Sequence, residues 1–229
     1  MKATYISHMG TDLTVVNAAR VSFNKVSKLE NVPLDGWDGS SQIWSRGLSE
    51  KDSKLIKYLA NHGHWTPFSH PQITMVEKVP VIVARQRFKH MVGFTYNEVS
   101  RRYVDEEPEF YVPTEWRSRP EGSVKQGSGE VFDEDKQEWL SRDYSFIIED
   151  MKKWYGHLIA AGVAPEQARM VLPQSMYTEY WVTGSLAAWA RAYKQRSDSS
   201  AQLEIQELAK QWDSVIRPLF PISWESLTK

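Results

Sequence analysis

The stretch RQRFKHMVGFTYNEVSRRYV, at positions 85–104, contains an unusual cluster of positive charge. Its cations outnumber its single carboxylate, Glu98, and aromatic residues alternate with them; the cations are Arg85, Arg87, Lys89, Arg101 and Arg102. The whole chain has a formal net charge of -1, so this clustering is local. Arginine side chains bind phosphate and other oxyanions through paired N–H groups, so the stretch predicts an anion-binding site. We expect its aromatic, β-like surroundings to desolvate Arg101 and Arg102.

Two other arginines are candidates for the same chemistry. Arg196 lies in KQRSDSSAQ, at the predicted end of one helix, and Ser199, Ser200 and Gln202 precede the next predicted helix. Helix starts bind oxyanions, but a single arginine at a helix end is most often a solvated partner of the helix dipole. Arg169 lies in PEQARMVLP, where spacing alone favours an ordinary surface arginine.

The segment HGHWTPFSH offers three histidines, His62, His64 and His70, as possible metal ligands. Their spacing fits no common metal site and no acidic partner is close, so we predict no metal. We interpret the segment as a turn, fixed by Pro67, whose polar side chains face a ligand. The sequence has no phosphate loop, no G-x-G-x-x-G and no G-x-S-x-G motif. It has no cysteine, which excludes disulfides, thiolate metal sites and cysteine nucleophiles.

Helices and strands must position these residues, and their patterns indicate an α+β fold in one domain. Alternation in 71–80 and the composition of 175–185 predict strands. Helical spacing and end signals predict helices at 50–63, 81–91, 133–161, 165–172, 185–196 and 201–220. Ser49 and Pro80 are expected to begin the first two of these helices. Segments 34–50 and 119–130, rich in glycine and polar residues, are predicted loops.

Composition narrows the function classes. No apolar run approaches the ~20 residues of a membrane span, and the start lacks a signal region, so we expect a cytoplasmic protein. Near-neutral charge argues against bulk nucleic-acid binding. The 10 tryptophans suit a flat aromatic ligand, a subunit interface or ordinary core packing.

Several segments resemble, in order along nearly the whole chain, the flavin-dependent thymidylate synthases, which are unrelated to the classical cysteine-dependent enzyme. These segments are VVNAARVSF (15–23), HGHWTPFSH (62–70), NEVSRRY (97–103), EFYVP (109–113), ARMVLPQSMYTEYW (168–181), TGSLAAW (183–189) and RSDSSAQLEIQ (196–206). Each segment alone is weak, but their common order is specific.

The resemblance implies a single domain, 1–229, with a mainly antiparallel sheet flanked by long helices. It implies conversion of deoxyuridylate (dUMP) to thymidylate (dTMP). Methylenetetrahydrofolate would supply the carbon, and reduced FAD, recharged by NADPH, would supply the hydride. A chain without cysteine cannot use the classical enzyme's nucleophile, whereas the flavin route needs none. The resemblance also implies a homotetramer whose active sites are shared between subunits.

The resemblance assigns roles to particular residues. It implies that dUMP is bound by Gln86, Lys89, Glu98, Val99, Ser100, Arg101, Arg102, Arg169 and Arg196. It implies that FAD is bound by Thr66, Lys89, His90, Glu98, Ser185 and Arg191. Arg196 would also be catalytic, because it would face the uracil ring and stabilise charge on a ring nitrogen.

The sequence departs from the family pattern at several positions. The family's Arg-His-Arg corresponds to Lys89, His90 and Met91, and one extra residue separates Met91 from Ser100. Serines replace the usual glutamate, asparagine and histidine at Ser69, Ser185 and Ser200. Two alternatives therefore remain open. One is the same flavin chemistry, as methylation or hydroxymethylation, on another pyrimidine nucleotide; the other is a non-catalytic homologue that binds flavin or nucleotide.

Overall fold

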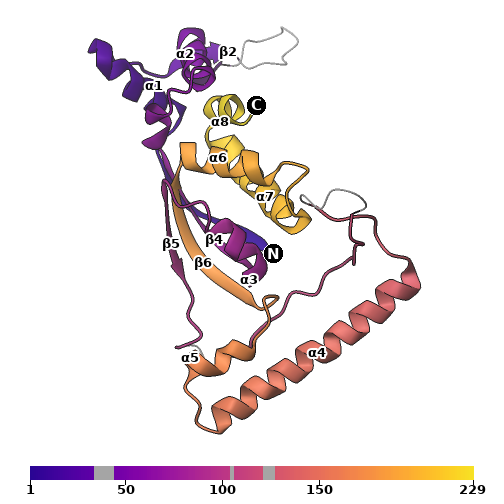
Figure 1. Cartoon of the computed structure of the whole chain (residues 1–229). Coiled ribbons are helices and arrows are strands. Elements are labelled where there is room, and N and C mark those ends of the chain that lie inside the picture. Colours follow the sequence, from indigo (N-terminus) through magenta and orange to yellow (C-terminus); the bar gives the residue numbers. More distant parts are fainter. Residues whose placement is uncertain (34–43, 104–105, 121–126) are drawn as a thin grey trace.

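A four-stranded antiparallel sheet lies at the centre of the molecule. The structure is a computed structural model that describes residues 1–33, 44–103, 106–120 and 127–229 (Figure 1). The strand order is β1-β4-β6-β5, and the strands are β1 (Lys2–Met9), β4 (Gln72–Pro80), β5 (Phe94–Glu98) and β6 (Tyr177–Ser185). Along β4, Ile73, Met75 and Val79 are fully buried while alternate residues are half-buried, so one face of the sheet forms the core.

The helices α3 (Val81–Arg87), α6 (Leu186–Arg196) and α7 (Leu203–Leu219) cover that face (Figure 1). The helix α8 (Pro221–Thr228) packs on α6, α7 and α2. The buried residues of α7 recur at helical spacing, from Ile205 through Trp212 to Ile216, because one stripe of the helix packs on the core. Trp189, Trp212 and Trp224 are fully buried. For these three tryptophans, core packing is therefore the correct interpretation.

The elements from the N-terminal third pack at one end of the sheet. They are α1 (Asp12–Arg20), η1 (Val21–Phe23), β2 (Glu30–Pro33), β3 (Trp44–Gly47), α2 (Glu50–Asn61) and η2 (Thr66–Ser69). Ser49 caps α2 as predicted, since its hydroxyl accepts the backbone N–H of Asp52 at 3.2 Å. The Asp52 carboxylate then accepts a hydrogen bond from Arg20 Nε at 2.9 Å, which ties α2 to α1.

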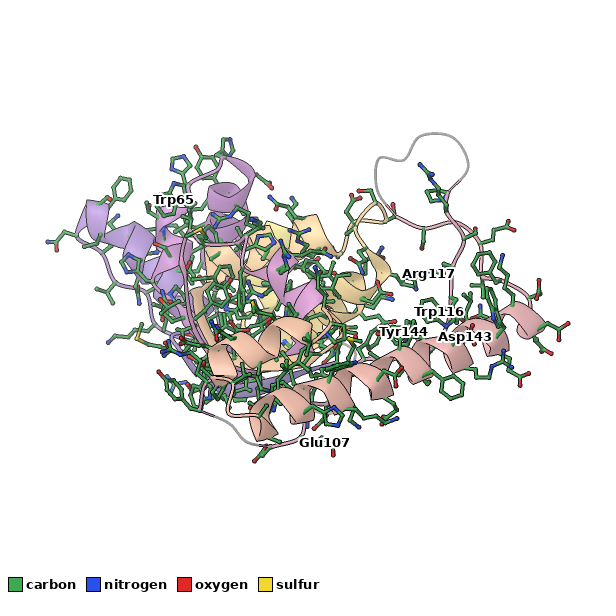
Figure 2. The ribbon with its side chains drawn as sticks, turned by 60° about the horizontal axis from the view of Figure 1, so that its bottom comes forward. Trp65, Glu107, Trp116, Arg117, Asp143 and Tyr144 are labelled. Atoms are coloured by element: carbon green, nitrogen blue, oxygen red, sulfur yellow. The ribbon has the colours of Figure 1, made fainter. Side chains whose placement is uncertain are left out.

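The helix α4 (Glu134–Ala160) lies apart from the sheet and is followed by α5 (Pro165–Ala168) and η3 (Arg169–Val171) (Figure 1). Trp116 and Tyr144 lie against each other where the preceding segment runs along α4, with ring centroids 5.2 Å apart (Figure 2). Ile148 is the one buried residue among the described residues of α4. An apolar stripe on this helix stays exposed at helical spacing, at Trp139, Phe146, Ile147 and Trp154. None of the helices in the described parts of the chain is long and apolar enough to cross a membrane.

The predicted elements agree with the structure in most places and need three corrections. The strands at 71–80 and 175–185 and the helices at 50–63, 133–161, 185–196 and 201–220 are present, with ends within a few residues. The helix predicted for 81–91 ends at Arg87, and Pro80 is its N-cap rather than its first residue. The helix predicted for 165–172 is split into α5 and η3.

The loop predicted for 34–50 is wrong at Trp44–Gly47, which pairs with β2; positions 34–43 lie outside the described residues. The glycine and serine content of this segment is typical of a loop, so the sequence pattern did not reveal the strand. Gly47 of this strand lies close to the Val32 side chain. The sequence patterns also missed β1, β2, β5, α1 and α8. The apolar residues of β1, β2, α1 and α8 are few or follow no clear period, and β5 is only five residues long. Of the loop predicted for 119–130, positions 121–126 also lie outside the described residues.

An ion pair lies at the centre of the core. Glu77 on β4 and Arg87 at the end of α3 are both 0% exposed, and Arg87 Nε lies 3.2 Å from Glu77 Oε2. Tyr180 of β6 donates its hydroxyl hydrogen to the same oxygen at 2.5 Å. Aromatic rings surround the Arg87 guanidinium, with Phe94, Trp189, Trp212 and Tyr96 centroids 4.3–5.2 Å from its Cζ. A cation over ring faces gains electrostatic stabilisation, which partly offsets its burial.

Replacing Glu77 with alanine should leave the Arg87 guanidinium buried without its carboxylate. Removing one partner of a buried ion pair costs about 3–5 kcal/mol, so we expect the free energy of unfolding to fall by that amount. Urea denaturation, followed by tryptophan fluorescence, measures the change. The matched control is Glu50→Ala, which breaks an exposed pair with Lys54 (2.6 Å) and should barely move the midpoint. Similar midpoints for the two variants would contradict this account of the core.

Candidate active site

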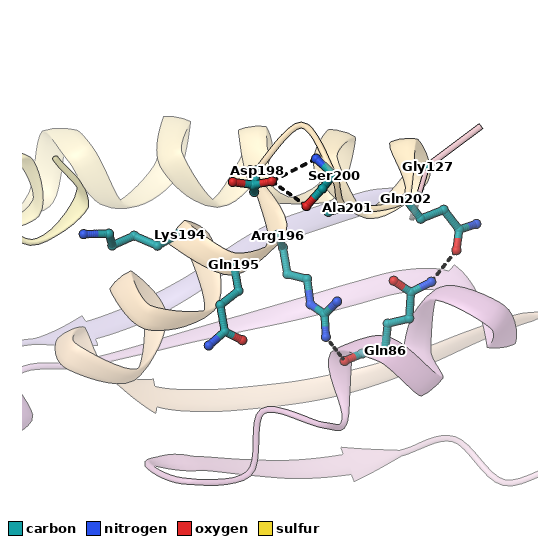
Figure 3. A pocket seen from close by; sticks show the side chains of 9 residues that line it. All are labelled: Gln86, Gly127, Lys194, Gln195, Arg196, Asp198, Ser200, Ala201 and Gln202. Carbon is teal, nitrogen blue, oxygen red and sulfur yellow. Dashed lines mark hydrogen bonds between the residues drawn. The ribbon is translucent and has the colours of Figure 1, made fainter. Parts of the chain in front are cut away.

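Arg196, at the C-terminal end of α6, is held against the loop that follows α3. Its Nε donates a hydrogen bond to Nε2 of His90 at 2.9 Å. Its Nη2 donates to the backbone oxygen of Gln86 at 3.2 Å (Figure 3). The structure thus brings together three predicted site residues that are far apart in sequence. Two of them, Arg196 and Gln86, border a cavity of about 610 Å³, which is lined by Gln86, Gly127, Lys194, Gln195, Arg196, Asp198, Ser200, Ala201 and Gln202.

His90 is a buried, neutral acceptor in this arrangement. Burial, together with the positive charges of Arg196, Arg87 and Arg191, lowers the pKa of His90 to about 4. The ring is therefore neutral near pH 7. Because Arg196 donates to Nε2, the single ring proton belongs on Nδ1. A neutral imidazole can hold the guanidinium in place without competing with an anionic ligand for its charge.

A tight turn places His90 beneath α6. Helix α3 ends at Arg87, and the chain reverses through Gly93, whose φ of +80° favours glycine. A Cβ at Gly93 would lie 2.9 Å from the Cβ of Ala188, so the turn also needs glycine for its close approach to α6.

Ser185 and Arg191 lie on the same turn from the α6 side. The Ser185 N–H donates to the oxygen of Gly93 at 3.1 Å, and the Ser185 hydroxyl caps α6 by accepting the N–H of Ala188 at 3.2 Å. Arg191 donates from Nη2 to the backbone oxygen of Val92. Lys89 is exposed beside them. Four predicted FAD-binding residues, counting His90, thus gather around one turn.

A second group of predicted residues forms around α5. Arg102 pairs with Glu166 at 3.4 Å, Arg101 donates to the backbone oxygen of Glu106, and Arg169 begins η3 one turn after Glu166. The expectation that Arg102 is desolvated is wrong for this chain. Its side chain is 49% exposed, because the Tyr103 ring, whose centroid lies 5.6 Å from the Arg102 guanidinium carbon, is itself exposed.

Strand β5 separates the two groups. The Glu98 carboxylate accepts the Thr178 hydroxyl hydrogen at 2.6 Å, and the Val99 N–H donates to the oxygen of Glu179 at 2.9 Å, which fixes the strand's end just before Ser100. Five residues of strand span about 16 Å at ~3.3 Å each. Among the described residues, no hydrogen bond or ion pair joins Arg196 and Gln86 to the arginines near α5. One chain therefore supplies two separate parts of the predicted site.

Thr66 lies in a third place, at η2, on a cavity of about 740 Å³. Tyr58, His64 and Phe23 also line this cavity, so it offers aromatic surface for a flat ligand. His62 stacks on Tyr58 with ring centroids 4.0 Å apart. In the described part of the chain, no three potential metal ligands among His, Cys, Asp and Glu converge.

Sequence reasoning missed several residues that shape the site. Arg87 was counted among cations for a ligand, but the anion that it binds is the internal carboxylate of Glu77. The lone carboxylate in the apolar strand QITMVEKVP was the available signal. Tyr96, which contacts both Arg87 and His90, was noted only as an aromatic residue. Gln202, in contrast, was named from the sequence with Ser199 and Ser200, and it accepts a hydrogen bond from Gln86 at the wall of the 610 Å³ cavity.

Comparison with known proteins gives a consistent result. The family model described as "Thymidylate synthase complementing protein" matches residues 4–222. A flavin-dependent thymidylate synthase of Thermosipho africanus is 36% identical over 224 residues, covering 98% of this chain and 89% of the relative. One of Thermotoga neapolitana is 35% identical over 221 residues, covering 96% of this chain and 88% of the relative.

Solved structures agree with these relatives. The UMP/dUMP methylase PolB from Streptomyces cacaoi, bound with 5-Br dUMP, superposes with a TM-score of 0.79 at 27% identity, over 99% of this chain and 94% of that one. The same enzyme bound with 5-Br UMP gives a TM-score of 0.81 at 25% identity, over 99% and 93%. The predictions of an α+β fold and of an enzyme are confirmed. This chain belongs to the flavin-dependent thymidylate synthase family, as the order of its motifs predicted.

Proposed function

We propose that this protein converts dUMP to dTMP, with methylenetetrahydrofolate as carbon donor and reduced FAD, recharged by NADPH, as hydride donor. The observation that carries the proposal is Arg196, held by neutral His90 and by the Gln86 carbonyl at the edge of a 610 Å³ cavity. The remaining N–H groups of its guanidinium can face a planar, anionic ligand there. The pyrimidine nucleotide named for the solved relatives has these properties.

The residues around α6 fit FAD. Arg191 and Lys89 supply positive charge, and the N-terminus of α6 begins at Ser185 next to them, a combination that suits a pyrophosphate. The aromatic cavity at Thr66 lies against the same helix, since η2 packs on α6. Bound FAD, once reduced, supplies the hydride that the protein's own side chains cannot.

The protein's part in the reaction is to bind and polarise the nucleotide. Burial and the nearby charge of Arg87 lower the pKa of Arg196, which indicates a partly desolvated guanidinium. Electrostatic interactions strengthen when water is excluded, so charge developing on the uracil ring would be stabilised there. Arg101, Arg102 and Arg169 would bind the phosphate, where they would exchange internal partners for the ligand.

We also propose a homotetramer with shared active sites. A nucleotide must reach both Arg196 and the arginines near α5, yet in the described part of one chain no hydrogen bond or ion pair joins these groups. The exposed stripe of α4, formed by Trp139, Phe146, Ile147 and Trp154, is large apolar surface that a second copy would cover. Association through α4 would place the α5 arginines of one subunit beside Arg196 of another. A cytoplasmic location stays a prediction.

A second candidate reaction is methylation of UMP. The solved relative is named a UMP/dUMP methylase and was bound with 5-Br UMP in one structure and 5-Br dUMP in the other. A chain of this family can therefore accept either sugar, and the substrate has to be tested with both nucleotides.

The purified protein should be yellow and should bind FAD without added metal. We expect the visible spectrum of oxidised flavin, and a product one methyl group heavier than dUMP when methylenetetrahydrofolate and NADPH are present. Mass spectrometry of the product, with dUMP and UMP offered in parallel, measures the reaction and its substrate. A colourless protein that takes up no flavin on titration would favour a non-catalytic homologue, and a product from UMP alone would favour the second candidate.

Replacing Arg196 with lysine should slow the reaction far more than it weakens nucleotide binding. Lysine keeps the positive charge but loses the planar fork that contacts His90 and Gln86. Removing a preorganised electrostatic contact costs about 10²-fold in turnover. The measurements are dUMP affinity by calorimetry and the rate of flavin oxidation by dUMP with methylenetetrahydrofolate. Equal losses in both would make Arg196 a binding residue only.

Shared sites predict that two inactive variants restore activity when they are co-assembled. Arg102→Ala should raise the dUMP dissociation constant about ten- to hundredfold, because a charge-assisted hydrogen bond is lost. Arg196→Lys damages the other part of the site. When the two chains are co-expressed and mix randomly, about a quarter of the sites should combine both intact arginines. Activity should recover to that fraction of the wild-type level; no recovery in a proven mixed assembly would place both arginines in one subunit's site.

A further inference from the structure

A continuous series of contacts connects the buried ion pair to the arginine at the cavity. Arg87 Nη1 donates to the hydroxyl of Tyr96 at 2.6 Å, and that hydroxyl donates to the backbone oxygen of His90 at 2.7 Å. The ring of His90 then accepts from Arg196. We propose that Tyr96 is a positioning residue for Arg196, which fixes the direction of the guanidinium through His90. The proposal rests on the proposed function, in which Arg196 polarises the nucleotide.

The hydroxyl of Tyr96 is suited to this role because it is both fixed and protonated. The rings of Phe88 and Phe94 pack on the Tyr96 ring at centroid distances of 5.0 and 5.9 Å, so the side chain has one available position. Burial is the main cause that raises the pKa of Tyr96 to about 12. At physiological pH the hydroxyl therefore stays protonated, so it can accept a hydrogen bond from Arg87 and donate one to the backbone oxygen of His90.

The His90 backbone depends on this contact. It lies in the short turn between α3 and β5, where its N–H donates to the oxygen of Arg87 at 3.1 Å. Tyr96 binds the carbonyl of the same residue. With both backbone groups bound, the peptide planes beside His90 are fixed, and so is the direction in which the ring presents Nε2 to Arg196.

Arg196 needs such support because it lies at the last residue of α6. A long arginine side chain at a helix end loses much rotational freedom when it adopts one geometry. Preorganisation of that geometry before the substrate binds is what makes an electrostatic contact effective in the transition state. Loss of Tyr96 should therefore reduce the rate of the reaction more than the affinity for dUMP.

Tyr180 provides a matched control. Its hydroxyl is also buried in the aromatic cluster, and it donates to the Glu77 carboxylate rather than to the turn. Tyr180→Phe removes a hydrogen bond of the same ion pair without touching His90. A general loosening of the core would affect both tyrosine variants alike, whereas positioning of Arg196 would affect only Tyr96→Phe.

The experiment compares Tyr96→Phe and Tyr180→Phe in the flavin-loaded protein and in the Arg196→Lys background. The readouts are dUMP affinity by calorimetry, the urea midpoint, and the rate of flavin oxidation by dUMP with methylenetetrahydrofolate. We expect Tyr96→Phe to slow the reaction about tenfold, with dUMP affinity changed less than about twofold. A lysine at position 196 cannot make the hydrogen bond to His90 in the geometry of Arg196. Loss of the Tyr96 hydroxyl should therefore slow the Arg196→Lys protein less than about twofold.

Several results would overturn the positioning role. They are an unchanged rate in Tyr96→Phe, an equal slowing in both backgrounds, or an equal slowing by Tyr180→Phe at the same urea midpoint. Failure of the proposed function is distinguishable, because then the wild-type protein itself would show no flavin oxidation by dUMP with methylenetetrahydrofolate. An unchanged rate in Arg196→Lys would instead remove the role of Arg196 on which the positioning role depends. If Tyr96→Phe does not fold, Arg87→Lys serves as the second variant. Lysine keeps the positive charge beside Glu77, but unlike the planar guanidinium it cannot bind Glu77 and Tyr96 at the same time. We therefore expect Arg87→Lys to change the rates as described for Tyr96→Phe.

Discussion

The ion pair between Glu77 and Arg87 is the constraint on which the arrangement of the site depends. Two charges at 0% exposure are costly unless each is paired and hydrogen-bonded. That requirement fixes the end of α3 against β4 and draws Tyr180 and Tyr96 toward the pair from the neighbouring strands. Arg87 Nη2 has no hydrogen-bond acceptor among the described residues, and the surrounding rings face the guanidinium instead. Replacement of the pair by apolar residues would fill the same space, but it would not provide a hydroxyl that is aimed at His90.

The predicted site residues of one chain lie in two separate groups, and neither group alone contains all the residues that the resemblance assigns to the nucleotide site. Each group is well built locally: Ser185, Arg191 and Gly93 around one turn, and Arg102 with Glu166 beside α5. The α5 group is exposed and its arginines use internal partners, as expected for surface that another subunit and a ligand complete. The helix α4 is likewise only partly covered: it packs on the 110–118 segment at Trp116 and Tyr144 and contacts α5 and η3, while its apolar stripe stays exposed. The uncovered part of that helix and the two separate groups of site residues are the features on which the proposed assembly rests.

Local patterns predicted the helices and the two central strands well, because hydrophobic period, capping and glycine stops act over few residues. Ser49 and Gly63 marked the ends of α2 correctly. The same reasoning misjudged Arg87, since its partner Glu77 lies on another element and only the fold brings the two together. The exposure of Arg102 was likewise set by tertiary arrangement rather than by its aromatic neighbours in sequence. The resemblance supplied the roles of Gln86, His90 and Arg196, and their convergence agrees with it; composition and spacing alone left Arg196 a possible solvated helix-end residue.

The loss of one family cation at Met91 bears on how the turn around His90 keeps its affinity for anions. Met91 is 74% exposed, so the substitution removes a charge from the surface of the turn rather than from its interior. The pKa of His90 responds to the potential inside the turn, and it is lowered by burial and by three arginines, Arg196, Arg87 and Arg191. None of these three arginines is at position 91, where the family pattern has its cation. The positive potential at the His90 ring therefore comes from arginines of α3 and α6, including the buried Arg87, while exposed Lys89 adds charge at the surface of the turn.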